Sequence, residues 1–565
     1  MNNCYTKYLP FVAAAIAILI VVRPSYGQAT QAEQLVLHTS NSMYLCGETI
    51  WYSVHHANME DEKNRSLVAY VNLHDKQGHL LIQQKVKLVQ GRSHGSMHIP
   101  LAWKEDYYYL TCFTLWNLQF EQQELSCRKI SIYNPFENVD TNYEPKNSLP
   151  TPTVSSSAGT VGIDMPDTTV HRRDTVNVTL SQNIGQMAVV SASIHSLGGL
   201  EADEYLFIKN QSAPLSSSPY YATEKPVNME RGLRVTGLAI DPATKKPVNS
   251  DILSLHQVGG DSFYRIASKN GEVCMDIQEF QGEAVLQLLN MNPYQSDAPD
   301  FEMKMPGQTL LGLDDTDVLL RNHAIDNYLK NARLLRKVIE IFDDPSTDSL
   351  SIMPTTKYPF DADKVYDMAK FQSMKTLEEF FREIVYNAEL SPKEDKHTLR
   401  LKNMESGRFF MEKPWYLVDG YLTRHEDAVL QIPFKNLERV EIYNRDKSII
   451  SQLEPVMVRS GMIAIYTNNN YLKEHTANGK NVFAFSGFGE QSSFVVQHPH
   501  EDKTKAMENP KFGFQLQWLH SLVLGQENTI SFVTSDLVGD YIIEIEGITS
   551  DGVALSGHHF FTVKY

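Results

Sequence analysis

The chain has 565 residues, with 51 Lys and Arg against 68 Asp and Glu, so its formal net charge is −17 at neutral pH. A chain this acidic is expected to repel nucleic acid and anionic surfaces, which argues against nucleic-acid-binding functions. A chain of this length predicts roughly three to five domains.

Residues 1–27 predict a secretory signal peptide. Lys7 precedes an apolar run over residues 11–22, and residues 25–27 (SYG) supply small residues for a cleavage site. The run is short for a membrane span, and an uncleaved anchor is the alternative interpretation. Without this segment 49 basic residues face 68 acidic ones, a charge of −19. No later segment is apolar over enough residues to predict a membrane span.

Cysteine usage indicates that disulfides do not build the fold. Four cysteines follow the predicted leader, without a C-x-x-C spacing, and their disulfide status stays open: Cys46, Cys112, Cys127 and Cys274. Cys112 alternates with Tyr108 and Leu110 along a strand pattern, which predicts a buried small apolar side chain rather than a nucleophile.

The first domain, residues 33–136, predicts one β-sandwich. Short segments of alternating polarity, separated by turns, favour seven strands at 33–38, 49–56, 67–74, 80–88, 95–99, 107–114 and 126–133. The domain resembles the second macroglobulin domain (MG2) of the alpha-2-macroglobulin superfamily, on residues 44–51 (YLCGETIW), 73–78 (LHDKQG), 90–95 (QGRSHG) and 107–114 (YYYLTCFT). This resemblance implies a binding or spacer domain rather than a catalytic one.

Two strings in this domain imitate catalytic motifs. Cys46 opens a Cys-Gly-Glu-Thr string similar to the macroglobulin thioester, but Thr49 cannot supply the acyl group that a Gln would provide. Ser93 sits in a G-x-S-x-G string, a motif that functions only on a strand-to-helix turn. A further strand follows it here, so we interpret residues 91–95 as the glycine turn of a hairpin.

The central chain predicts more β structure and one helical region. Residues 137–163 read as a linker, residues 164–228 as a partial β-sandwich, and residues 229–305 as a further β-sandwich. This third unit resembles the carboxypeptidase-regulatory-like domain on residues 233–241 (LRVTGLAID), 246–248 (KPV) and 270–273 (NGEV), which implies no peptidase activity.

Residues 306–372 predict a helical connector with its helix over residues 314–342, where apolar residues recur at helical spacing. Packing against a sheet is the expected role of this helix. A partner-binding or membrane-surface helix is the alternative.

Residues 373–470 resemble the plug domain of TonB-dependent outer-membrane receptors. The matching segments are 373–381 (SMKTLEEFF), 414–420 (PWYLVDG), 437–443 (LERVEIY) and 461–467 (GMIAIYT). Only 95 residues follow Asn470, too few for a barrel of about 22 strands, so we expect a plug-like module without a transporter.

The remaining chain predicts a linker over residues 471–510 and a β-sandwich segment over residues 511–565. Residues 528–536 (NTISFVTSD) and 539–552 (GDYIIEIEGITSDG) resemble the terminal sandwich of envelope proteins of the Bacteroidota. Residues 164–228 and 511–565 each hold too few strands for a sandwich, so we expect them to form one discontinuous domain. Two small open sandwiches are the alternative.

Histidine pairs do not predict a metal site. His55 and His56, like His558 and His559, are neighbours on strands and point to opposite faces, while His498 and His500 lie in a polar linker. We therefore predict no catalytic, cofactor-binding or metal-binding residues and no cofactor.

The predicted fold class is mainly β and multi-domain, with tandem immunoglobulin-like or macroglobulin-like β-sandwiches and an α+β plug-like module. The resemblances imply a non-catalytic interaction or scaffold protein of the bacterial envelope, periplasmic or associated with the outer membrane. Its expected partner is an outer-membrane or periplasmic protein, such as a receptor-type barrel or its assembly. An envelope hydrolase with a dispersed active site and a degenerate macroglobulin-like protease-binding protein are the alternatives.

Overall fold

The computed structural model describes the chain from residue 32 onward, with internal gaps. The described ranges are 32–57, 62–120, 123, 125–136, 159–182, 187–211, 219–222, 228–260, 262–291, 299–313, 317–342, 360–371, 374–393, 396–453, 455–468, 481–491, 494, 512–525 and 527–565. The predicted signal peptide, residues 137–158 of the predicted linker, and the pair His498 and His500 lie outside these ranges.

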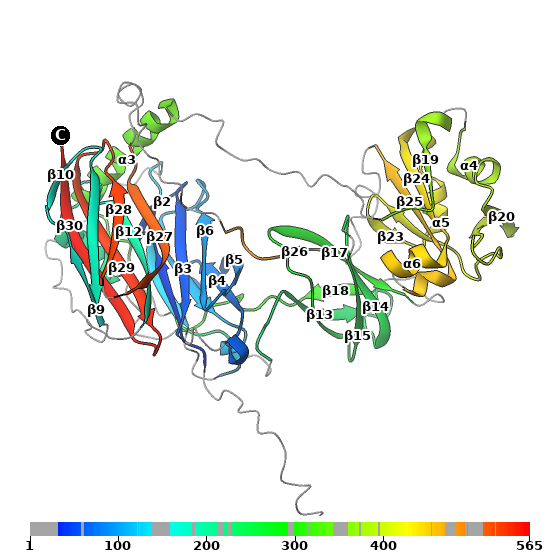
Figure 1. Cartoon of the computed structure of the whole chain (residues 1–565), viewed down its shortest axis with the longest axis horizontal. Helices are drawn as coiled ribbons and strands as arrows, with labels where there is room; N and C mark the ends of the chain where they lie inside the picture. Colours follow the sequence, from blue (N-terminus) through cyan, green and yellow to red (C-terminus); the bar gives the residue numbers. More distant parts are fainter. Residues whose placement is uncertain are drawn as a thin grey trace, which may run out of the picture.

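The protein is mainly β and multi-domain, as the sequence predicts, and its sheets follow one another along an elongated molecule (Figure 1). We distinguish a first sandwich (residues 32–136), a terminal sandwich (159–196 with 512–565), a middle module (228–303 with 481–488) and a distal module (360–468). The two sandwiches lie together at one end and the distal module lies at the other (Figure 1).

Two sheets of alternating strands form the first sandwich. One sheet has the order β1-β3-β6 and the other β2-β8-β7-β4-β5. The strands are β1 (Leu35–Thr39), β2 (Met43–Leu45), β3 (Thr49–His56), β4 (Val68–His74), β5 (Leu80–Lys87), β6 (Arg92–His98), β7 (Asp106–Phe113) and β8 (Ser126–Tyr133). Each of the seven predicted strands overlaps one of these. The three-residue β2 is additional, because so short a strand shows no alternation.

Strands from two distant parts of the sequence form the terminal sandwich. β12 pairs with β27 on one side and with β29 on the other, while β11 pairs with β28 and β9. The strands are β9 (Gly159–Asp164), β10 (Thr169–His171), β11 (Thr175–Gln182), β12 (Ala188–Ser196), β27 (Gln515–Leu524), β28 (Glu527–Val533), β29 (Gly539–Thr549) and β30 (Ala554–Lys564). The predicted pairing of the two segments is confirmed. β9 begins inside the predicted linker.

Two helices cover the terminal sandwich. α2 (Ala202–Gln211) and α3 (His323–Phe342) contribute Tyr205, Ile325 and Tyr328 to a buried cluster that also contains Ile542 of β29. The predicted connector helix therefore packs on a sheet, but it begins at residue 323 rather than 314. Asn322 accepts a hydrogen bond from the Ile325 amide at 2.9 Å and so caps the helix there. Among the described helices, none is long and apolar enough to cross a membrane.

The middle module consists of two small sheets, β16-β13-β18 and β15-β14-β17-β26. Its strands are β13 (Arg234–Ile240), β14 (Ser250–Gln257), β15 (Phe263–Ser268), β16 (Glu272–Asp276), β17 (Glu283–Asn290), β18 (Asp300–Met303) and β26 (Val482–Ser486). The prediction of a linker over 471–510 is wrong for β26, which pairs antiparallel with β17. A five-residue strand whose partner lies about two hundred residues earlier gives no local pairing signal.

A five-stranded sheet of order β19-β24-β25-β22-β23 organises the distal module. Its elements are β19 (Lys364–Asp367), α4 (Leu377–Glu383), β20 (Ala388–Lys393), β21 (Lys396–Leu401), β22 (Trp415–Val418), β23 (Tyr421–Thr423), α5 (Glu426–Leu430), β24 (Leu437–Tyr443), α6 (Asp446–Gln452) and β25 (Met462–Thr467). The sequence predicts a connector up to residue 372, and this is wrong for residues 364–367, which form strand β19 of this sheet. The mostly exposed side chains of β19 give no apolar alternation.

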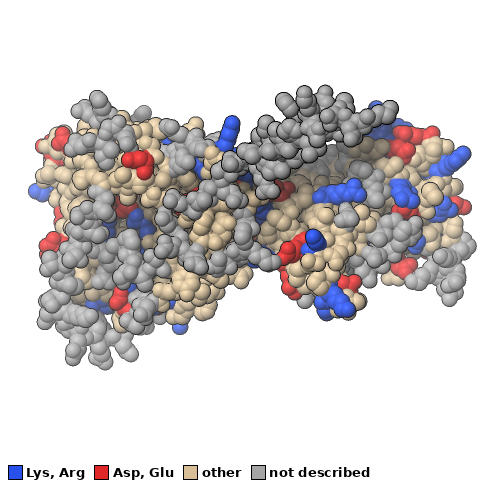
Figure 2. Space-filling model, turned by 90° about the horizontal axis from the view of Figure 1, so that it is seen from below, with Lys and Arg blue, Asp and Glu red and all other residues tan. Residues whose placement is uncertain are grey.

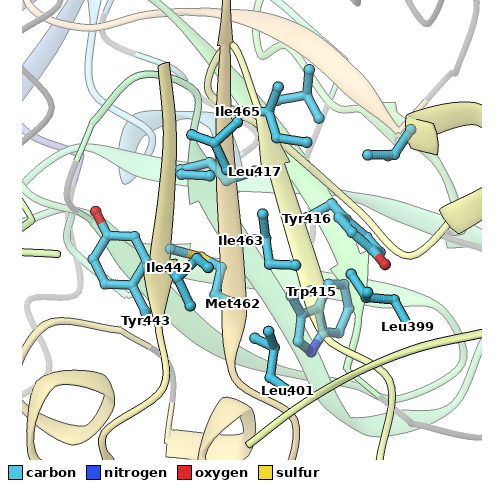
Figure 3. Close-up of a cluster of buried hydrophobic side chains, with 14 of the residues drawn as sticks. Leu399, Leu401, Trp415, Tyr416, Leu417, Ile442, Tyr443, Met462, Ile463 and Ile465 are labelled. Atoms are coloured by element: carbon cyan, nitrogen blue, oxygen red, sulfur yellow. The ribbon is translucent and has the colours of Figure 1, made fainter. Parts of the chain in front are cut away.

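The distal core lies between this sheet and the surrounding helices. Figure 3 shows apolar side chains of β22, β24 and β25 clustered in this core, among them Leu417, Ile442 and Ile463. All three are at most 1% exposed. Burial of each side chain of this size contributes about 1.5–3 kcal/mol, so these strands hold the module together.

The middle and distal modules share a packed contact. The Gln287 side chain exchanges two hydrogen bonds with the backbone of Leu422, both at 2.9 Å. Gly420 has a φ of +89°, and a Cβ there would lie 2.8 Å from the amide nitrogen of Gly259. Only glycine allows this close approach of the two backbones.

Short 3-10 helices complete the described structure. They are Glu62–Asn64, Asn117–Gln119, Met368–Phe371, Phe434–Asn436 and Pro455–Arg459.

Candidate binding site at the module junction

A pocket of about 300 Å³ opens where the first sandwich meets the middle module. We call it the junction pocket. Its walls come from β5, β6 and the turn between them, from a short segment that precedes β17, and from the chain that follows β26. They comprise Val86, Lys87, Val89, Ser93, His94, Glu279, Phe280, Gln281, Phe488, Gly489 and Gln491.

The segment after β26 closes the pocket by running along the edge of β5. The Gly489 amide donates to the carbonyl of Lys85 at 2.8 Å. The backbone of Phe488 forms isolated parallel β-bridges with Lys85 and with Gln281. Lys85 also donates to the Ser486 carbonyl at 2.8 Å, with its ammonium 3.7 Å from the Phe485 ring centroid. The pocket therefore exists only when three separate stretches of sequence meet.

A buried acid and base lie beside this contact. Burial lowers the pKa of Lys85 to about 8, and burial raises the pKa of Glu230 to about 7. The Tyr70 hydroxyl donates to both carboxylate oxygens of Glu230, at 3.1 and 3.2 Å. These groups lie inside the contact, so we assign them to holding the two modules together.

The pocket rim is charged and its floor is apolar. Lys87 and Glu279 form an ion pair at 2.5 Å across the rim, and both side chains are about two-fifths exposed. Phe280 and Phe488 supply apolar surface behind them. The apolar floor suits an apolar side chain of a ligand, and the charged rim suits polar groups next to that side chain.

The two pocket residues with reactive side-chain types do not form a catalytic pair. Ser93 and His94 are consecutive on β6 and therefore point to opposite faces. The Ser93 hydroxyl is buried without a hydrogen-bond partner, and the His94 ring stacks on His520 of β27 at 3.7 Å. Burial, with a smaller effect of His520, lowers the pKa of His94 to about 4.

The predicted hairpin turn over residues 91–95 is wrong in position, and the strands on either side of it, β5 and β6, belong to different sheets rather than to one hairpin. The turn lies at Gln90 and Gly91, which have φ values of 50° and 74°, and Ser93 belongs to β6. Gly91, in the left-handed region, ends the turn, and β6 begins at the next residue, Arg92. Ser93 still lies far from any strand-to-helix turn among the described residues, so it is not a nucleophile elbow.

The other cysteines and histidines considered as catalytic or metal-binding candidates in the first domain are also buried inside the fold. Cys46 is fully buried, with its thiol 3.4 Å from the Trp103 carbonyl. Cys112 is fully buried, as predicted, and burial raises the pKa of its thiol. His56 lies 3.7 Å from Glu33, whereas His55 points to the opposite face. The part of the chain that the structure describes contains no group of three or more potential metal ligands.

A polar interface that the sequence does not reveal joins the first and terminal sandwiches. Arg128 of β8 forms an ion pair with Glu546 of β29, and Lys209 of α2 contacts Glu544 at 2.5 Å. Burial raises the pKa of Glu546, but nearby positive charge, mainly that of Arg128, outweighs this effect and holds the pKa at about 2. Glu546 is therefore ionised at neutral pH, which keeps this ion pair formed.

Histidines line the same interface. His38 of β1 lies 2.5 Å from the Ser191 hydroxyl of β12, and burial lowers its pKa to about 4. His55 of β3 is fully buried with both ring nitrogens unpartnered, and burial lowers its pKa to about 3. His195 of β12 contacts the Tyr205 hydroxyl at 2.9 Å. The packed interface therefore requires these rings to be neutral.

Together these observations define a multi-domain, mainly β protein with an inter-module pocket and a histidine-lined interface. No family model matches the chain, and no curated protein sequence matches it. Similar solved structures include the alpha-2-macroglobulin of E. coli in its native conformation, with 8% identity and a TM-score of 0.23 over 95% of this chain and 40% of that one. Salmonella alpha-2-macroglobulin reacted with methylamine has 10% identity and a TM-score of 0.23 over 94% and 39%.

A DUF4785 family protein of Legionella pneumophila matches 30% of this chain and 40% of its own, with 10% identity and a TM-score of 0.13. The chain thus spans about two fifths of the length of these macroglobulins. At such low identity and TM-score, the likenesses assign no function to the chain.

Proposed function

We propose that the chain is a non-catalytic interaction protein of the bacterial envelope, which docks onto an outer-membrane barrel or its assembly. The plug-like pattern of residues 373–470 and the predicted signal peptide motivate the choice of partner and compartment. The observation that carries the interaction role is the junction pocket, whose apolar floor and charged rim are built by two modules at once.

A pocket of this size and lining accommodates an apolar side chain of a partner, not a large substrate. Its volume of about 300 Å³ lies at the lower end of the range for small-molecule sites. Its serine and histidine point to opposite faces of β6 and cannot transfer a proton between them. Recognition, rather than bond cleavage, is the chemistry that these side chains support.

Capture of partners from solubilised outer membrane tests this proposal. We expect tagged protein to co-purify a specific envelope protein, and Val89→Asp to weaken the capture about tenfold or more, because a charge at the pocket wall must be desolvated. Val89 is 56% exposed, so this substitution should leave the fold intact. Val553→Asp, at an exposed valine of the terminal sandwich, is the matched control.

Specific capture that is unaffected by Val89→Asp would move the interaction to another surface. No specific capture, together with hydrolysis in a broad peptide and glycan screen, would replace the proposal with the hydrolase alternative. Capture of proteases alone would favour the protease-binding alternative.

A further inference from the structure

The distal module exposes an apolar and basic loop at residues 402–413, between β21 and β22. Six consecutive residues of this loop, 404–409, are exposed. Met411 is 83% exposed, Phe409 39% and Met404 36%. Large apolar side chains exposed together on one loop cost free energy in water and commonly mark a contact surface.

Neighbouring segments extend this surface. The Lys402 amide donates to the Asn387 carbonyl at 2.7 Å, and Lys402 bridges to Phe409, so the loop lies beside Tyr386. Tyr386 is 66% exposed, and the Lys364 ammonium lies 5.6 Å from its ring centroid. Aromatic rings next to lysines, at an exposed face, are typical of contact with a membrane interface.

Basic residues outnumber acidic ones here, although the whole chain is acidic. Residues 400–413 contain four basic side chains and two acidic ones. Of the two acids, Glu412 pairs with Arg459 at 3.1 Å, and Glu405 accepts a hydrogen bond from the Lys447 amide at 3.3 Å. Of the four bases, Lys413 pairs with Glu426 at 3.1 Å, whereas Lys402 and Arg408 have no ion pair among the described residues. Glu405 keeps its charge, so the loop presents a small excess of positive charge.

The net charge of −17 does not cancel this local charge. Charges more than about 8 Å apart at the surface are largely screened at physiological ionic strength. Figure 2 shows basic and acidic side chains interspersed on the visible face of the molecule, so no single field covers it.

We propose that residues 402–413, with Tyr386 and Lys364, form a membrane-surface contact that inserts Phe409 and Met411 between anionic phospholipid headgroups. A lipid surface fits these observations better than a protein partner, because the exposed side chains project from a loop and lipids close around protruding side chains without a matched pocket. The distal module that carries this loop lies at one end of the elongated molecule (Figure 1).

Vesicle co-sedimentation with the exported protein, from which residues 1–27 are expected to be removed, tests the proposal. We expect binding to vesicles of phosphatidylethanolamine and phosphatidylglycerol, weaker binding at high salt, and little binding to phosphatidylcholine alone. Phe409→Ser combined with Met411→Ser should weaken partitioning about tenfold or more. Arg408→Gln should weaken it about fivefold, since one basic residue near an anionic surface contributes about 1 kcal/mol.

The matched control is Leu311→Ser combined with Val318→Ser. These residues are 38% and 85% exposed, close to the values of Phe409 and Met411, but lie outside the distal module. Vesicle binding that the loop variants lose and the control retains supports the proposal.

Absence of vesicle binding by the unmodified protein overturns the proposal. So does a loss of vesicle binding in the control variant that equals the loss in the loop variants. Loss of protein capture in the loop variants, without any vesicle binding, also overturns it and makes the loop a protein-docking surface. These results are independent of the junction-pocket variants, so failure here does not decide the proposed function.

Discussion

Replacement of His55 by leucine should reduce the acid sensitivity of the protein. His55 is fully buried between the two sandwiches, near His38, Arg92 and His520, with neither ring nitrogen partnered. Burial lowers its pKa to about 3, whereas an unfolded histidine titrates near pH 6.5. The unfolded chain therefore binds a proton that the folded chain excludes, and stability falls as the pH drops through this window.

The expected magnitude follows from this difference. Each pH unit below about 6.5 costs about 1.4 kcal/mol per excluded proton, so acidification to about pH 5 costs about 2 kcal/mol at His55. Glu546, with its pKa at about 2, stays ionised throughout this range. His55→Leu removes the titrating group and fills a similar volume, so it should recover about 2 kcal/mol at about pH 5.

Calorimetric unfolding between about pH 7.5 and pH 5 measures this effect, which corresponds to a few degrees in Tm. Hydrogen exchange at the β3 and β27 amides would locate it at the interface. His98→Leu, at an exposed position on β6, is the control and should leave the pH dependence unchanged. Parallel pH dependences for His55→Leu and the unmodified protein would refute the reasoning.

The fold and its contacts lead to three further predictions. Arg128→Ala should destabilise the sandwich pair by about 3 kcal/mol in denaturant titrations, because it leaves Glu546 ionised and poorly solvated, and an unchanged midpoint would contradict the assigned ion pair. Residues 511–565 expressed alone should not melt cooperatively, since β12 separates β27 from β29; a soluble fragment with a sharp transition would show that the segment folds by itself. Cys46→Ala and His56→Ala should leave partner capture intact with stability losses of about 0.5–3 kcal/mol, and loss of a measured activity at unchanged Tm would argue for catalysis.

Local pattern predicts much of the fold. The strands of the first sandwich and the core strands of the distal module overlap their predicted ranges, because alternating burial leaves a period of two in the sequence. The burial of Cys112 and the opposed faces of His55 and His56 follow from the same period. The shared domain of residues 164–228 and 511–565 follows from a count of strands against the size of a sandwich.

Tertiary structure alone decides the sites. Phe488 and Phe280 become pocket walls only because β26 returns to β17 after the distal module, and the strand itself lies where the sequence predicts a linker. His55 lies beside His520 because two sandwiches pack together, and Met411 is exposed because no described element covers its loop. Periodicity reports which face of a strand is buried, but it carries no information about which distant segment buries it.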